Sequence, residues 1–101
     1  MEHYSIPKSS FSNFLWINDG ALFDNVTLIE IEMTNGGAFR LEMLDKNDKI
    51  LSKGSRENPR GGWHTFTPSQ MQPPVQSGPY KLKLVSEAPG IRKIHGGNVH
   101  Y

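Results

Sequence analysis

The sequence predicts an all-β protein, an antiparallel β-sandwich or jelly roll of about seven to eight short strands. Apolar and polar residues alternate in several segments, as they do in strands with one dry and one wet face. No segment keeps apolar residues at helical spacing, so no α-helix beyond a single turn is expected. Turn signals recur at roughly ten-residue intervals, which is typical of sandwiches. With 101 residues the chain is expected to be one domain, residues 1–101.

The N-terminal half contains three strand signals. A dense apolar cluster at residues 11–17 predicts the first, and a polar turn follows it. Within residues 26–33 and 38–44, apolar side chains at positions 29, 31, 33 and 39, 41, 43 alternate with polar ones, so each segment has one face for the core. Only a short segment with Asn-Gly-Gly at residues 35–37 separates them, and they are therefore expected to pair as an antiparallel hairpin.

The C-terminal half continues the same pattern. Residues 50–53 follow a polar turn and should close a further hairpin. Residues 54–62 contain no large apolar side chain and are expected to form an exposed loop. Residues 80–85 show the clearest alternation in the chain, and a last strand or strands, broken by two glycines, should occupy residues 91–101.

Composition excludes several classes of function. The chain has 11 basic and 10 acidic residues, and a net charge of +1 provides no long-range field for nucleic acid. No apolar run is long enough to span a bilayer, so neither nucleic acid nor a membrane is an expected partner. The absence of cysteine excludes disulfides and thiolate chemistry. No secretory signal is visible, which predicts either a cytoplasmic protein or an excised extracellular module.

No motif indicates catalysis or a cofactor. The chain lacks a serine nucleophile elbow, a zinc-protease helix and a phosphate-binding glycine loop. Its carboxylates lie mostly on the polar faces of predicted strands, where such groups are usually solvated. His95 and His100 have no spacing known from metal sites. The chain is therefore expected to be neither an enzyme nor a metal or cofactor binder.

Trp63 is the most informative single residue, because two glycines precede it directly. Phe66 follows three residues later, so in a strand the two rings point to opposite faces and one of them must face solvent. Two interpretations of Trp63 remain open. The indole could close one end of the sandwich, or it could offer a flat apolar face on which a sugar ring stacks.

Three segments carry a resemblance to a known family. They are Gly-Gly-Trp-His-Thr-Phe at residues 61–66, Ser-Gly-Pro-Tyr-Lys-Leu-Lys-Leu-Val at residues 77–85 and Gly-Asn-Val-His-Tyr at residues 97–101. Together they resemble the C-terminal half of family-6-type carbohydrate-binding modules. The resemblance implies a jelly-roll sandwich that binds sugar without catalysis.

The same resemblance implies roles for individual residues. Trp63 matches the tryptophan that stacks on the sugar, and Asn98 matches the asparagine that hydrogen-bonds to it. Phe23 matches the second aromatic residue of the family's site, because Asn-Asp-Gly-Ala-Leu-Phe at residues 18–23 resembles the family's Asn-Gly-Asp-Trp-x-x-Tyr stretch. His100 stands where the family has an aspartate that helps to hold a structural calcium, so the calcium site is not carried over.

The sequence thus leads to two functional hypotheses. The first is a module that binds an oligo- or polysaccharide through Trp63, Asn98 and Phe23. The alternative is a protein-interaction or assembly module, such as a phage or bacterial surface or structural protein. Trp63 would then anchor a partner protein, since tryptophan is prominent among interface hot spots.

Overall fold

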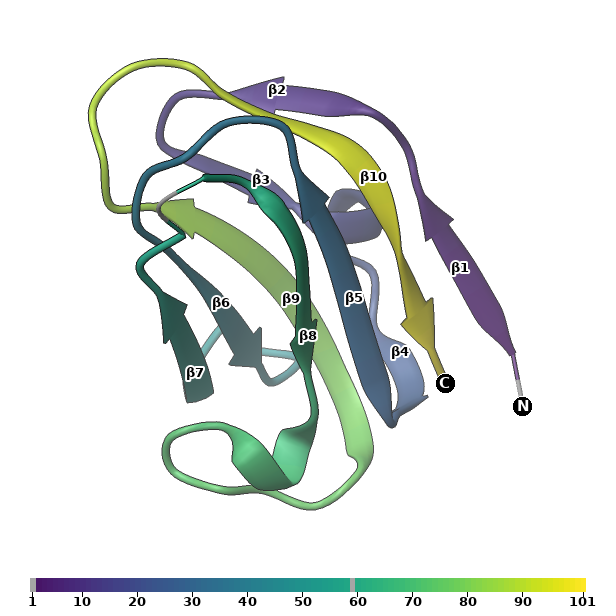
Figure 1. The fold of residues 1–101 in the computed structure, drawn as a ribbon. Coiled ribbons are helices and arrows are strands. Elements are labelled where there is room, and N and C mark those ends of the chain that lie inside the picture. Colours follow the sequence, from purple (N-terminus) through teal and green to yellow (C-terminus); the bar gives the residue numbers. More distant parts are fainter. Residues whose placement is uncertain (1, 59) are drawn as a thin grey trace.

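A computed structural model describes residues 2–58 and 60–101, in which ten strands form two antiparallel sheets packed face to face (Figure 1). The first sheet contains β1 (His3–Ile6), β2 (Ser9–Phe11), β5 (Leu28–Met33), β8 (Gly62–Phe66) and β10 (Arg92–His100). The second contains β3 (Phe14–Trp16), β4 (Phe23–Val26), β6 (Phe39–Leu44), β7 (Ile50–Arg56) and β9 (Gly78–Ser86). The only helical segments in this part of the chain are two 3-10 turns, η1 (Ile17–Gly20) and η2 (Pro68–Gln70). The predicted all-β sandwich is confirmed.

The ten strands occupy eight positions, four in each sheet. β1 and β2 lie end to end along the same edge of β10, and β3 and β4 lie end to end along β9. Pro7 separates β1 from β2, since proline has no amide hydrogen to donate to the ladder. The turn η1 separates β3 from β4. The expected seven to eight strands thus agree with the eight strand positions. One edge position in each sheet is occupied by two short strands in place of one.

Alternation also assigned the faces of the strands correctly. In β5 the side chains of Ile29, Ile31 and Met33 are buried, and the glutamates between them are partly exposed. In β9 the inward side chains are again the alternate apolar ones. The core between the sheets is built from these residues and from three inward phenylalanines of other strands, Phe23, Phe39 and Phe66.

The hairpin expected between residues 26–33 and 38–44 is wrong. β5 pairs with β10 and β8, whereas β6 pairs with β7 and β9, so the two strands lie in different sheets. Residues 34–38 carry the chain from one sheet to the other. Crossing over lets the apolar faces of β5 and β6 pack against each other across the core, and a flat hairpin would leave them side by side.

Two further segments differ from expectation. β7 extends to Arg56, and Asn58 is buried: its Nδ2 donates to the carbonyl of Asn35 over 3.0 Å, and its own carbonyl accepts from the amide of Gly37 over 2.8 Å. The segment expected as an exposed loop is thus partly integrated into the fold, and Pro59 within it lies outside the described residues. The C-terminal segment is one strand, β10, with a bulge between Ile94 and Gly96.

Lys83 illustrates a contact that alternation alone does not reveal. It points outward from β9, but its Nζ lies 4.3 Å from the ring centroid of Phe14 and 5.1 Å from that of Trp16. We expect Lys83→Ala to lower the free energy of unfolding by about 0.5–1 kcal/mol, as is usual for exposed cation–π contacts. Urea denaturation would measure this, with Lys46→Ala in an exposed turn as the control. Equal stability of the two variants would contradict the contact.

Candidate interaction surface on the first sheet

Trp63 belongs to β8, an edge strand of the first sheet (Figure 1), and its side chain lies on the outer face of that sheet. The strand begins at Gly62, and the φ angles of Gly61 and Gly62, 80° and 99°, are readily adopted only by glycine. Trp63 stands opposite Glu32 of β5, and 56% of its surface is exposed. Phe66 is only 1% exposed. The prediction that these two rings point to opposite faces is confirmed, and it is the indole that faces solvent.

Asn98 lies on the same outer face, in β10, where its amide belongs to a hydrogen-bonded network. The Nε2 of His3 donates to the Oδ1 of Asn98 over 2.5 Å, and the Nδ2 of Asn98 lies 3.5 Å from the Oε1 of Glu30. The Nε2 of His100 lies 2.9 Å from the same carboxylate oxygen. The rings of His3 and His100 stack with centroids 5.4 Å apart. Asn98 is thus tied to neighbouring strands.

Trp63 and Asn98 share a face without forming one compact site. Asn98 pairs with Glu30, and Trp63 pairs with Glu32 on the far side of β5. Two inter-strand spacings and two residues along the strand separate them, which corresponds to roughly 12 Å between Cα atoms.

Phe23 does not belong to this surface, so its assignment as a second ligand-stacking aromatic is corrected. It is 1% exposed and packs edge-on against Tyr4, with ring centroids 5.5 Å apart, and against Tyr101, at 5.1 Å. In β4 it lies opposite Tyr80 and points between the sheets. A ring enclosed on all sides cannot stack on a ligand, and its burial contributes instead to the core.

His64 alternates with Trp63 and therefore points inward. Its ring packs edge-on against Phe39 with centroids 5.0 Å apart, and its Nε2 donates to the Oδ1 of Asn58 over 2.7 Å. Burial lowers the pKa of His64, and the positive charge of Arg56 lowers it further. The imidazole is therefore a structural group at the margin of the core.

The lowered pKa of His64 predicts a pH effect on stability. Below about pH 6.5 an unfolded histidine takes up a proton, whereas folded His64 stays neutral until lower pH. The unfolded state then binds more protons, so the free energy of unfolding should fall as the pH decreases below about 6.5. We expect His64→Gln to flatten this dependence between pH 7 and 5 in urea melts. His95→Gln, at an exposed position, should leave it intact, and the reverse pattern would contradict the assignment.

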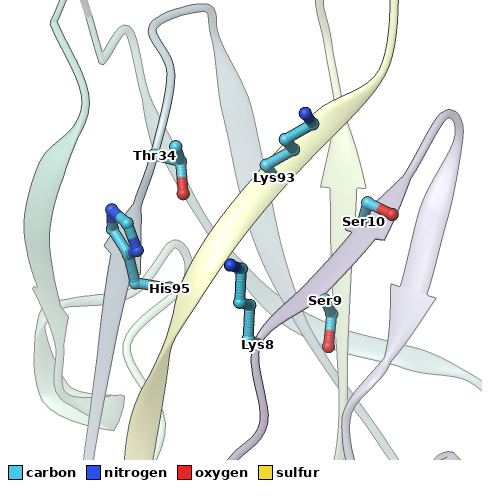
Figure 2. A pocket seen from close by; sticks show the side chains of 6 residues that line it. All are labelled: Lys8, Ser9, Ser10, Thr34, Lys93 and His95. Carbon is cyan, nitrogen blue, oxygen red and sulfur yellow. The ribbon is translucent and has the colours of Figure 1, made fainter.

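A groove with a volume of about 510 Å³ opens on the outer face beside β10 (Figure 2). It is lined by Lys8, Ser9, Ser10, Thr34, Lys93 and His95. Strand pairing lapses here on both sides of β10, because β1 and β2 are separated at residues 7–8 and β10 bulges away from β5 around residue 95. Gly96 is required in the bulge, since a Cβ there would lie 2.7 Å from the carbonyl oxygen of Ile6.

The lining of the groove is basic and hydroxylic, with no carboxylate in it. Neither Lys8 nor Lys93 forms an ion pair with an acidic side chain of residues 2–58 and 60–101. Sequence reasoning missed this site because its residues come from three distant segments. The usable signal was Pro7, which interrupts the edge strand directly before Lys8.

The described part of the chain has neither a metal cluster nor a helix that could cross a membrane. It contains no group of three or more histidine, aspartate or glutamate side chains placed to hold a metal ion. None of its helices combines the length and the apolar character that crossing a membrane would require.

No protein-family model and no curated protein matches this chain. Among solved structures it is similar to FlgD from Xanthomonas campestris, with a TM-score of 0.54 and 16% sequence identity over 96% of this chain and 67% of that chain. That structure was described for its insights into hook capping, which is essential for flagellar assembly.

These comparisons overturn the prediction of a carbohydrate-binding module. FlgD was described for its part in flagellar assembly, and no family model or curated protein matches to support the resemblance to family-6-type modules. The buried Phe23 also removes one of the three residues on which sugar binding depended. This chain has the β-sandwich fold, and a flagellar hook-capping protein is built on a similar one.

Proposed function

We propose that this chain is a non-catalytic protein-interaction module that takes part in assembling a larger protein structure. It docks to a partner through the outer face of the first sheet, with Trp63 as the anchor. The observation behind the proposal is the 56% exposure of this indole on a strand that pairs with β5 along its length.

The surroundings of Trp63 favour an interface. Its strand neighbours on the outer face are polar: Glu32 stands directly opposite, and Thr65 is two residues along β8. A large aromatic group within a polar rim is the arrangement found at the centre of many protein interfaces. Covering the indole would remove a large apolar area from water at little entropic cost, because the side chain has only two rotatable bonds.

The solved structure of FlgD supports the same class of function. Its description concerns hook capping, which is essential for flagellar assembly. The interaction hypothesis that the sequence left as the alternative thus agrees with both the exposed anchor and the neighbour.

A site-specific photocrosslinker placed at position 63 in the producing cells tests the proposal. We expect a discrete crosslinked species that contains this chain and one defined protein partner, which includes a second copy of the chain. Position 14 provides the matched control, because Phe14 is also an exposed aromatic, 48% exposed, on the second sheet. Equal crosslinking at both positions, or none at position 63, would overturn the proposal.

A further inference from the structure

We infer that the basic groove beside β10 binds an acidic segment of the partner protein, an extended stretch in which aspartate or glutamate side chains contact Lys8, Lys93 and His95. The inference rests on the proposed interaction function and adds the chemistry of the partner. It assigns a binding site to residues that the sandwich itself does not use in its core.

The lining groups come from three segments: residues 8–10 at the start of β2, Thr34 directly after β5, and Lys93 and His95 of β10. Ser10 stands opposite Lys93, and the same register places Lys8 opposite His95. Figure 2 shows Lys8, His95 and Thr34 turned toward a common space beside β10. Two basic side chains, Lys8 and His95, therefore flank the position that a carboxylate would occupy, and Lys93 lies farther along β10.

These groups keep their binding capacity in the free protein. Neither Lys8 nor Lys93 is paired with any acidic side chain of residues 2–58 and 60–101. The hydroxyl groups of Ser10 and Thr34 form no hydrogen bond within the same residues, whereas Ser9 already donates to the carbonyl of Pro7 over 2.8 Å. Two ammonium groups and two hydroxyl groups are thus available to an anionic ligand.

The position of the groove favours a peptide as the source of the anion. Gly96, next to His95, stands opposite Glu32, which in turn stands opposite Trp63. The indole and the groove are therefore about two inter-strand spacings apart, roughly 10 Å. An extended chain covers that distance with about three residues. One partner segment can place an apolar side chain on Trp63 and acidic side chains in the groove.

The charge distribution argues against nucleic acid as the occupant. The whole chain has a net charge of +1, and the groove contains no arginine, the residue best suited to paired contacts with phosphate. Lysines act as point charges, and two of them with flanking hydroxyl groups match separate carboxylates along a peptide.

Fluorescence anisotropy with a fluorescein-labelled octapeptide containing four consecutive acidic residues tests the inference. We expect saturable binding that weakens as sodium chloride rises from 50 to 300 mM. Lys8→Gln combined with Lys93→Gln should weaken binding about fivefold or more, since each lost charge contact is modest by itself. Lys46→Gln combined with Lys49→Gln removes the same charge from a turn of the second sheet and should leave binding within twofold.

Amide chemical shifts of the labelled protein locate the bound peptide. Shifts confined to residues 8–10, 34 and 93–96 support the inference. Equal loss of binding in the two double variants, or shifts elsewhere, would overturn it. Tighter binding of inorganic phosphate or oligothymidylate to the same residues would identify a phosphate site and also overturn it. These outcomes do not depend on crosslinking at position 63. Failure of the groove as a peptide site can therefore be distinguished from failure of the interface at Trp63.

Discussion

Phe66→Ala is expected to lower the free energy of unfolding by about 3–5 kcal/mol, the usual cost of truncating a buried phenylalanine. The ring is 1% exposed and packs edge-on against Phe39 with centroids 6.2 Å apart. The guanidinium carbon of Arg56 lies 4.2 Å from its centroid. Gly54 packs directly against the ring, and a Cβ atom on Gly54 would lie only 2.9 Å from Cδ2 of Phe66. A cavity at this point would remain largely open.

Trp63→Ala is the matched control for Phe66→Ala, because both replace an aromatic residue of β8 on opposite faces. We expect it to cost under about 1 kcal/mol, as for exposed side chains, and to abolish binding of the partner that crosslinking at position 63 identifies. Urea denaturation followed by circular dichroism compares the two variants. If Trp63→Ala unfolded the protein and Phe66→Ala did not, the indole would belong to the core and the proposed interface would fail.

Arg92→Ala is expected to lower the free energy of unfolding by about 2–4 kcal/mol, since it removes packing and leaves buried acceptors without a donor. Arg92 is 1% exposed. Its Nη2 donates to the carbonyl of Gly37 over 2.7 Å, and its Nη1 donates to that of Ala38 over 2.8 Å and to the Oγ of Ser86 over 3.1 Å. The side chain thereby holds the crossover between the sheets against the end of β9.

Arg92→Lys separates the role of the charge from that of the geometry. A lysine keeps the positive charge but cannot present two donors in a fixed planar fork. We therefore expect Arg92→Lys to lose most of the same stability in urea melts. Wild-type stability of both variants would show that the crossover does not depend on this side chain.

The local pattern of the sequence predicted the strand faces well. The alternation in residues 28–33 and 80–85 correctly identified the buried side chains, because successive side chains of a strand point to opposite faces. The same parity predicted that either Trp63 or Phe66 must face solvent. Parity could not decide which of the two rings does so.

The candidate site was predicted only in part. Trp63 and Asn98 both reached the outer face of the first sheet, but the amide of Asn98 is tied to His3 and Glu30, and Phe23 is in the core. A motif resemblance assigns roles by position along the chain. It contains no information on which neighbours surround a side chain, and burial depends on those neighbours.

Arg92 shows where a sequence signal existed but was not decisive. It stands two residues before Ile94, at an inward position of the last strand. Alternation back from the buried Ile94 corresponds to a charged side chain in the core, which is rarely tolerated without hydrogen-bond partners. Its partners are backbone carbonyls of Gly37 and Ala38. Backbone acceptors leave no mark in the sequence, so only the folded structure identifies them.

The sequence by itself determined the all-β class, the faces of the main strands and the opposition of Trp63 and Phe66, because these follow from the two-residue period of a strand. The tertiary structure decided that β5 and β6 lie in different sheets, that Phe23 is enclosed and that residues 8–10, 34 and 93–95 meet at one groove. Periodicity is local, whereas strand partners are chosen by which apolar faces can cover each other across the core. The groove exists only because β1 and β2 reach β10 from the opposite end of the chain.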